Sequence, residues 1–224
     1  MTTQNLALFD LDNTLLAGDS DYNWSLFLIE EGLLDAKTHH DRNEQFYLDY
    51  KNGCLDIYAF LKFQLQPLSQ HPKAFLDQLH LKYMDKVIRP MMTEKAQALV
   101  NEHKANGDLC LVITATNSFV TKPIATAYGI EHLIGTDPEM VNGEYTGGVS
   151  GVPSFQAGKV TRLNQWLEAR GQTLTDFPQS YFYSDSHNDL PLMQLVTHPV
   201  AVDADPTLAE YAKAHHWPVI SLRN

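Results

Sequence analysis

Two aspartates two positions apart, Asp10 and Asp12, come directly after a short apolar run, Leu6–Phe9. Such a run is typical of a buried strand, and two like charges at its end are costly unless a cation lies between them. Mg²⁺ would supply that cation, because it binds hard oxygen ligands, usually one or two carboxylates together with water and phosphate oxygens. The alternative is a strand that runs into an Asx-type turn, where Asp and Asn are ordinary residues. Other segments must decide between the two.

Two further apolar runs also end in polar clusters. Residues 109–113 lead into the cluster 114–118, and residues 181–183 lead into the cluster 184–189. Ligands of open α/β sheets bind at the carboxyl ends of the strands. If the strands are parallel, all three clusters lie at one edge of the sheet, and we expect them to form one site.

Lys159 is the fourth element of this expected site. Together with Gly158 it begins a segment with helical periodicity. A cation at a helix N-terminus opposes the helix dipole at a cost of roughly 0.3–1 kcal/mol, so its position indicates an anion to be bound. The alternative for Lys159 alone is a solvated surface lysine.

The elements that must position these residues indicate an α/β fold. Strand-like and helical segments alternate after Pro90, and their continuous apolar runs are typical of a doubly wound parallel sheet. Asn142-Gly143 predicts a hairpin turn. In residues 17–87 aromatic and aliphatic residues instead recur at helical spacing. We therefore expect a Rossmann-like core from residues 1–16 and 88–224, with residues 17–87 as an inserted helical cap.

Composition excludes several classes of partner. The 224 residues carry a net charge of -11, and no basic run is interleaved with aromatics, which argues against nucleic acid. No segment approaches the length of a membrane span, and no leader is visible, so a cytoplasmic protein without a membrane partner is expected. The spacing of Cys54 and Cys110 is typical of neither a metal site nor a disulfide framework. The expected partner is a small molecule, and the protein is expected to be a monomer or homodimer.

Four segments together resemble the four motifs of the haloacid dehalogenase superfamily of phosphatases. Residues 9–16 resemble the first motif, residues 112–114 the second, Lys159 the third, and residues 184–191 the fourth. The resemblance covers nearly the whole chain. A helical insertion between the first and second motifs is similar to subfamily IB, the phosphoserine phosphatase-like branch, in which the insertion is a mobile cap.

The resemblance implies a Mg²⁺-dependent hydrolysis of phosphate monoesters. Asp10 would attack phosphorus and form an aspartyl-phosphate, while Asp12 would protonate the leaving alkoxide and then deprotonate water. The metal would be held by Asp10, the backbone carbonyl of Asp12 and Asp185, with Asp189 nearby or acting through water.

The phosphate itself would be bound by three further residues. The Thr114 hydroxyl and Lys159 would bind the phosphoryl oxygens, where negative charge is spread in the transition state, and Asn188 would orient this region. In the fourth motif Ser184 and Ser186 stand where phosphoserine phosphatases usually have glycine. These serines and the following His187 are expected to shape the loop rather than to catalyse.

The residues expected to select the substrate differ from those of phosphoserine phosphatases. Asp19 stands where a glutamate binds the substrate amine, and Lys62 stands where an arginine binds its carboxylate. Lys is a poorer bidentate partner than Arg, which argues against phosphoserine. Residues 15–21 and the overall length are more similar to a related bacterial branch that includes histidinol-phosphate phosphatases.

A small phosphate ester with an amine and a flat ring, such as histidinol phosphate, is therefore the expected substrate. Its amine would pair with Asp19, and its ring would stack on Trp24. Alternatively, Asp19 only caps a helix and Trp24 only fills the core. Phosphoserine, a broad range of small metabolites, phosphoryl transfer to an acceptor other than water, and a binding protein without activity also stay open as alternatives.

Overall fold

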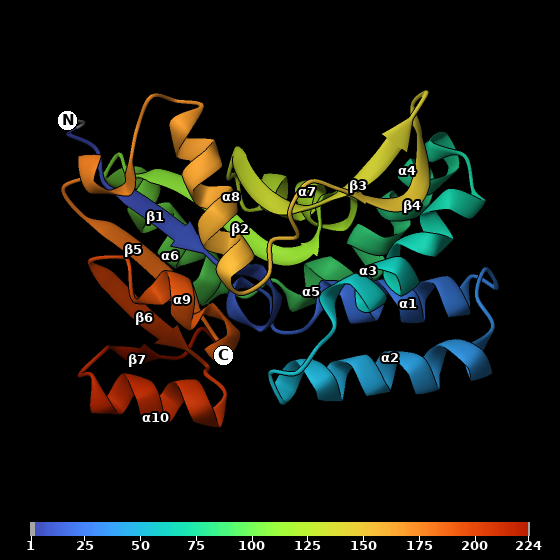
Figure 1. Cartoon of the computed structure of the whole chain (residues 1–224), viewed down its shortest axis with the longest axis horizontal. Coiled ribbons are helices and arrows are strands. Elements are labelled where there is room, and N and C mark those ends of the chain that lie inside the picture. The colour runs from blue at the N-terminus through green and yellow to red at the C-terminus, as the bar shows by residue number, and fades with distance from the viewer. Residues whose placement is uncertain (1–2, 224) are drawn as a thin grey trace.

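A seven-stranded sheet forms the centre of the molecule (Figure 1), and the computed structural model describes residues 3–223. The strands are β1 (Leu6–Phe9), β2 (Leu109–Asn117), β3 (His132–Val141), β4 (Glu144–Ser150), β5 (Ser180–Ser184), β6 (His198–Val202) and β7 (Val219–Ile220). They are ordered β4-β3-β2-β1-β5-β6-β7, and all neighbours are parallel except β3 and β4. The predicted α/β fold is confirmed.

The central strand β1 shows why the sheet is covered on both faces. Successive side chains of a strand point to opposite faces. Ala7 and Phe9 belong to one buried apolar cluster, and Leu6 and Leu8 belong to the other. All four side chains are fully buried, so a polar residue at any of them would lose a packing partner on one face or the other. This burial explains the uninterrupted apolar run in the sequence.

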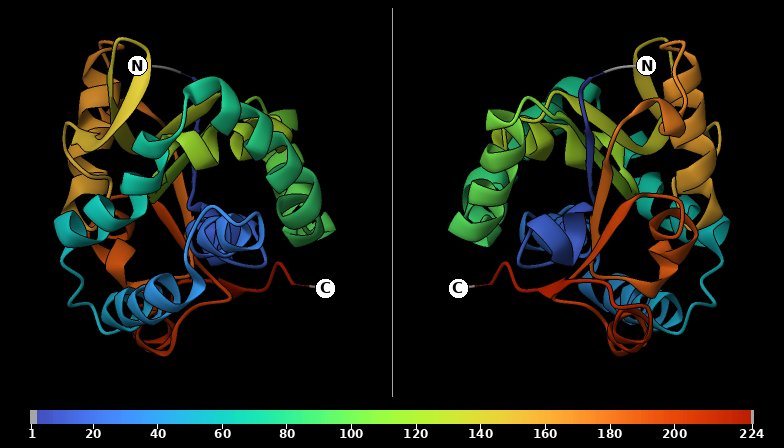
Figure 2. Two further views of the ribbon diagram at one scale, coloured as in Figure 1. Left: turned by 90° about the vertical axis from the view of Figure 1, so that its right-hand side faces the viewer. Right: turned by 90° about the vertical axis from the view of Figure 1, so that its left-hand side faces the viewer.

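Helices supply the rest of each cluster, and Figure 2 shows them on both sides of the sheet. The cluster around Phe9 includes buried residues of α6 (Glu94–Ala105) and α7 (Ser118–Ala127). The cluster around Leu8 includes residues of α8 (Ala157–Glu168), α9 (Leu190–Met193) and α10 (Pro206–Ala214). Within residues 3–223, none of the helices has the length and apolar character needed to cross a bilayer.

The segment between β1 and β2 is helical, as predicted. It contains α1 (Ser20–Glu30), α2 (Ala36–Lys51), α3 (Ile57–Leu65), α4 (Lys73–Tyr83) and α5 (Arg89–Met91), with helical turns at Gln66–Gln70 and Met84–Ile88. In Figure 1 helices α1 to α4 gather beyond the carboxyl end of β1. Trp24, Leu61 and Leu76 of these helices belong to the same apolar cluster as Phe9. The division of the chain at residues 17 and 87 into core and cap stays a prediction.

The hairpin between β3 and β4 turns at the predicted residues. Asn142 has φ 53° and Gly143 has φ 84°, so both lie in the left-handed region that a two-residue hairpin turn requires. The antiparallel pairing continues from Val141↔Glu144 to Asp137↔Ser150.

Candidate active site

The three predicted polar clusters lie at one edge of the sheet. Strand register pairs Phe9 with Val112 of β2 and with Tyr183 of β5, so the residues that follow them reach the same level. The strand β2 is longer than the apolar run that predicts it and includes Thr114. A hydrogen bond from the Asp10 amide to the Tyr183 carbonyl, 2.9 Å long, continues the pairing past the end of β1.

Lys159 lies between two carboxylates of this edge. Its Nζ is 2.7 Å from Oδ1 of Asp10 and 2.7 Å from Oδ2 of Asp189. The lysine is 3% exposed, so the alternative of a solvated surface lysine is wrong. Gly158 makes this placement possible, because a Cβ at that position would approach the Pro153 carbonyl oxygen to 2.1 Å.

Thr14 joins the first motif to the fourth. Its hydroxyl lies 3.2 Å from Oδ2 of Asp10 and 3.1 Å from Oδ1 of Asp185, and it accepts a 3.0 Å hydrogen bond from the Asp185 amide. A hydroxyl carries one hydrogen and can donate to one of the two carboxylates at a time. The Asp10 and Asp185 carboxylates therefore share one donor.

These carboxylates carry more negative charge than the protein balances. Burial raises the pKa of Asp10 to about 7, partly opposed by Lys159, and Asp189 raises it further. Burial also raises the pKa of Asp185 well above its usual range, as do Asp10 and Asp189. Burial would lower the pKa of Lys159, but the two neighbouring carboxylates raise it. One lysine thus faces three carboxyl groups, of which those of Asp10 and Asp189 are buried.

The donor set at this edge fits a hard divalent cation. Asp10 and Asp185 converge on the single Thr14 hydroxyl, whereas Asp189 is occupied by Lys159 and by the Ser184 hydroxyl at 2.7 Å. In the described part of the chain, no three His, Cys, Asp or Glu side chains form a metal cage by themselves. A metal here would need oxygens from the main chain, water or phosphate as well, as Mg²⁺ usually does.

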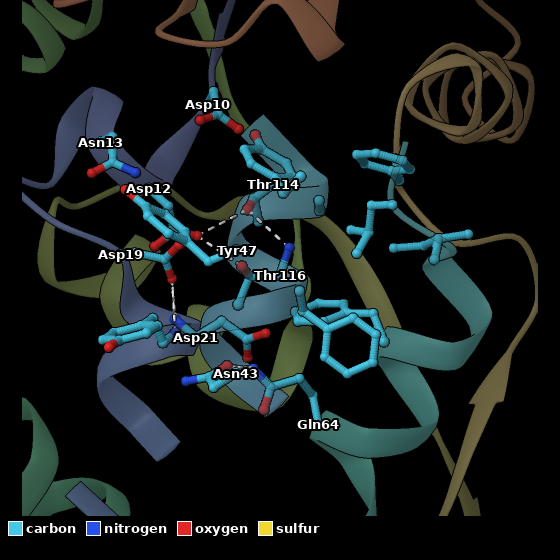
Figure 3. A pocket seen from close by; sticks show the side chains of 18 residues that line it. Asp10, Asp12, Asn13, Asp19, Asp21, Asn43, Tyr47, Gln64, Thr114 and Thr116 are labelled. Carbon is cyan, nitrogen blue, oxygen red and sulfur yellow. Dashed lines mark hydrogen bonds between the residues drawn. The ribbon is translucent and has the colours of Figure 1, made fainter. Parts of the chain in front are cut away.

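Asp12 and Asp10 both line a cavity beside this cluster (Figure 3). The Oδ1 of Asp12 accepts a 2.6 Å hydrogen bond from the Ser20 amide, and its Oδ2 accepts one of 2.8 Å from the Thr116 hydroxyl. The Thr114 hydroxyl lies 3.5 Å from the same Oδ2. Burial raises the pKa of Asp12 to about 6, and the charge of Asp19 adds to this. A carboxyl group that titrates near neutral pH is suited to acid–base chemistry.

The cavity has a volume of about 70 Å³ and lies between the sheet edge and the inserted helices. Four carboxylates line it, those of Asp10, Asp12, Asp19 and Asp21, and no Lys or Arg of residues 3–223 is among its lining residues. Aromatic rings form much of the remaining wall: Tyr22, Phe46, Tyr47, Tyr50, Phe60 and Phe155. The cavity is therefore acidic and aromatic.

Of the three residues predicted to contact the substrate, only Asp19 lines the cavity. Asp19 lines the cavity and also caps α1, since its Oδ1 accepts hydrogen bonds from the amides of Asp21 and Tyr22. Trp24 is only 2% exposed and packs against rings of α4 and α7, so the core-filling alternative holds for it. Lys62 is exposed on α3 and does not line the cavity, because Phe60 and Gln64 present the opposite face of that helix to it.

Three buried polar residues that line the cavity were not predicted from the sequence: Asp21, Asn43 and Gln64. Asp21 accepts a 3.1 Å hydrogen bond from the Asn117 amide group. Gln64 donates to Oδ1 of Asn43 at 3.3 Å and accepts from the Ser25 hydroxyl at 2.9 Å. One sequence signal could have identified such residues, namely a polar residue on the apolar face of a predicted helix. Gln64, between Leu61 and Leu65, is an example.

The fourth motif contacts the inserted helices through Asn188. Its Nδ2 donates to the Tyr50 carbonyl at 3.1 Å, and its Oδ1 accepts from Gln156 at 2.9 Å. His187 pairs with Asp205 at 2.8 Å, which supports a structural role for this histidine. The Ser186 hydroxyl accepts a 3.2 Å hydrogen bond from the Asn188 amide and shapes the loop, as expected.

This arrangement of strand ends is that of a known hydrolase family. A family model described as haloacid dehalogenase-like hydrolase matches residues 7–194. The chain belongs to this family, and the prediction of a phosphatase of this superfamily is confirmed.

Individual relatives cover the whole chain. A protein of Neisseria meningitidis serogroup C (strain 8013) named histidinol-phosphatase is 49% identical over 221 residues, which are 98% of this chain and 100% of that protein. A crystal structure of a protein of unknown function from Bordetella pertussis Tohama I matches 99% of this chain and 100% of its own, with a TM-score of 0.94 and 49% identity. A substrate-bound phosphoserine phosphatase shares the fold at a TM-score of 0.68 and 19% identity, covering 100% of this chain and 95% of its own.

Proposed function

We propose that the protein hydrolyses a small phosphate monoester with Mg²⁺, through an aspartyl-phosphate on Asp10, and that histidinol phosphate is its substrate. The observation that carries the chemistry is the contact of Lys159 with both Asp10 and Asp189 at the sheet edge, next to a cavity that Asp12 lines. In this proposal Asp10 is the nucleophile, Lys159 the cation and Asp12 the acid–base group, and their proximity supports these roles.

Asp10, Asp185 and the backbone carbonyl of Asp12 would hold the Mg²⁺ ion. When bound, the ion would offset the repulsion between the Asp10 carboxylate and a phosphate dianion. Asp189 would stay close to the ion without binding it directly, because its Oδ2 already accepts from Lys159 and Ser184.

Asp10 and Asp12 divide the chemistry between them. A carboxylate oxygen of Asp10 forms a bond to phosphorus as the ester oxygen leaves, and protonated Asp12 gives its proton to that oxygen. In the second step Asp12 takes a proton from the attacking water, which releases phosphate and restores Asp10. Lys159 and the Thr114 hydroxyl bind the phosphoryl oxygens, and Asn188 holds the loop beside them.

The cavity supports a cationic substrate. Its lining includes the carboxylates of Asp12, Asp19 and Asp21, and within the described part of the chain it contains no lysine or arginine to pair with a substrate carboxylate. An ammonium group would pair with Asp19, and an imidazole ring would lie between the aromatic walls, near Asp21 and Gln64. The relative named histidinol-phosphatase supports the same choice of substrate.

Phosphate release from a small set of esters tests the proposal. With Mg²⁺, histidinol phosphate should be turned over with a higher kcat/KM than phosphoserine or O-phosphoethanolamine, and excess chelator should stop the release. A preference for phosphoserine would refute the assignment of histidinol phosphate as the substrate. Phosphoryl transfer to an added alcohol in place of water would refute the hydrolytic role. If no ester is turned over, the proposal that the protein is an enzyme is wrong.

A further inference from the structure

Residues 10–16, which follow β1 and contain Asp10 and Asp12, are called the catalytic loop. Three successive carbonyl groups of this loop are bound by side chains from distant parts of the chain. The Arg223 guanidinium donates to the Asn13 carbonyl through Nη2 and to the Thr14 carbonyl through Nη1, the latter at 3.1 Å. The Tyr128 hydroxyl donates to the Leu15 carbonyl at 2.7 Å. The loop thus depends on outside donors at the residues that directly follow Asp12.

The conformation of the loop explains why it needs these donors. Asp12 has an extended backbone (φ -71°, ψ 130°), and Asn13 is in the left-handed region (φ 57°, ψ 1°). Residues other than glycine are uncommon in that region, and they persist there where the surrounding structure fixes them. Because a planar guanidinium presents parallel N–H groups, it can bind two neighbouring carbonyls at once.

Arg223 is itself held by further contacts outside the loop. Its Nη1 lies 3.6 Å from Oδ2 of Asp203, which also accepts from the Leu222 amide at 2.9 Å. The Thr93 hydroxyl donates to the Leu222 carbonyl at 2.7 Å, and Lys95 donates to the Arg223 carbonyl at 2.5 Å. The segment after β7 is therefore fixed to β6 and α6 before it reaches the loop.

The side chains controlled by this stretch of backbone are those of the proposed reaction. Thr14, whose carbonyl Arg223 binds, holds its hydroxyl between Asp10 and Asp185. Asp12 directly precedes Asn13, so a change in the Asn13 backbone would move the Asp12 carboxyl group and its carbonyl oxygen. Arg223 does not line the cavity and would not touch the substrate.

We propose that Arg223 is a positioning residue, which fixes the Asn13–Thr14 backbone so that Asp12 and Thr14 keep the geometry required for catalysis. This inference rests on the proposed function for its kinetic test, but it does not depend on which phosphate ester is the substrate. The expected consequence is a loss in kcat rather than in substrate affinity, because the loop sets the positions of reacting groups and a misplacement of about 1 Å can cost roughly 100-fold in rate.

The test compares Arg223→Ala and Arg223→Lys with a matched control, Arg170→Ala. Arg170 lies over the Trp166 ring and donates to Oε1 of Gln172 at 3.3 Å, and within residues 3–223 its side chain makes no hydrogen bond to residues 10–18. For Arg223→Ala we expect kcat to fall about 10- to 100-fold on both histidinol phosphate and p-nitrophenyl phosphate, with KM nearly unchanged. Added guanidinium ion, at concentrations that do not unfold the protein, should restore part of the rate. The kcat of Arg223→Lys should be intermediate, since an ammonium group lacks the two parallel N–H groups of a guanidinium.

Hydrogen exchange gives a measurement that does not require activity. The amides of Asn13 and Leu16 donate to the carbonyls of Gly18 and Leu11, both at 2.9 Å, and their exchange reports the order of the loop. Arg223→Ala should speed exchange at these two amides, whereas Arg170→Ala should not.

The outcomes separate the inference from the proposed function. If the wild-type protein releases no phosphate from any ester, the proposed function fails, and the exchange experiment alone decides the role of Arg223. If the wild-type protein is active but Arg223→Ala keeps its kcat, or loses rate only in proportion to the unfolded fraction and without rescue by guanidinium, Arg223 is a structural anchor and the inference is wrong.

Discussion

The Nζ of Lys159 lies 2.7 Å from Oδ1 of Asp10, although 149 residues separate them in the chain. Both side chains are more than nine-tenths buried. The contact fixes the Asp10 carboxylate in one orientation, with its other oxygen 3.2 Å from the Thr14 hydroxyl.

Asp10→Asn should abolish turnover. An amide is a very poor nucleophile toward phosphorus, so kcat should fall by about three orders of magnitude or more. Phosphate release measures the loss, and circular dichroism checks that the variant is folded. Asp41→Asn, an exposed site on α2, is the matched control. Near wild-type turnover by Asp10→Asn would contradict the covalent route.

Removal of divalent metal should lower both activity and stability at neutral pH. Chelator should stop turnover, Mg²⁺ should restore it, and Ca²⁺ should substitute poorly because its coordination is larger and looser. Stability is measured as the melting temperature, with and without Mg²⁺. If excess chelator leaves both activity and melting temperature unchanged, the metal assignment is wrong.

The metal-free protein should also show a characteristic pH dependence. The pKa of Asp10 is raised from 3.8 to about 7, so between these values the folded state binds more protons than the unfolded state. Stability should therefore fall as the pH rises through this window. The melting temperature of the wild type, compared with that of Asp10→Asn over the same pH range, isolates this contribution. A difference between the two that does not change with pH would contradict it.

Thr116→Val should move the pH profile of the reaction. The Thr116 hydroxyl donates to Asp12 at 2.8 Å and stabilises its charged form, so the variant should have a higher Asp12 pKa than the wild-type value of about 6. Because Asp12 must be protonated to act as an acid, kcat/KM should fall at a higher pH in the variant. Thr126→Val, on the exposed side of α7, should leave the profile unchanged. Identical profiles for the wild type and Thr116→Val would show that Asp12 is not the acid.

Asp21→Asn should weaken recognition of the substrate ring more than it slows the chemical step. A hydrogen bond to a charged group contributes about 1.5–3 kcal/mol, so kcat/KM for histidinol phosphate should fall about 10- to 100-fold. O-phosphoethanolamine, which has the amine but no ring, should lose much less. Lys62→Ala, on the exposed face of α3, is the control and should leave kcat/KM for both esters unchanged. Equal losses on both esters would place Asp21 outside ring recognition.

The fold and the convergence of polar residues at the sheet edge were predictable from short stretches of sequence. A run such as Leu6–Phe9 must be buried on both faces, because each alternate side chain needs an apolar partner, and this identifies a central strand. Parallel strands end at one edge, so the polar residues that follow them are brought together whatever lies between them. The Asn142-Gly143 turn was predictable for a similar reason, since few residues adopt its left-handed conformation.

Contacts between distant segments were decided only by the tertiary structure. Helical periodicity places Trp24 on an apolar face, but only the packing of α4 and α7 shows that this face is closed by the core rather than open to the cavity. In the sequence Asp21 and Gln64 are ordinary polar residues of helices. Only the tertiary structure encloses them, between three helices and the end of a strand. Arg223 carries no local signal at all, because the carbonyls it binds are 209 and 210 residues away. A periodic pattern shows which side of an element is buried, whereas the element that covers it is chosen by the packing of the whole chain.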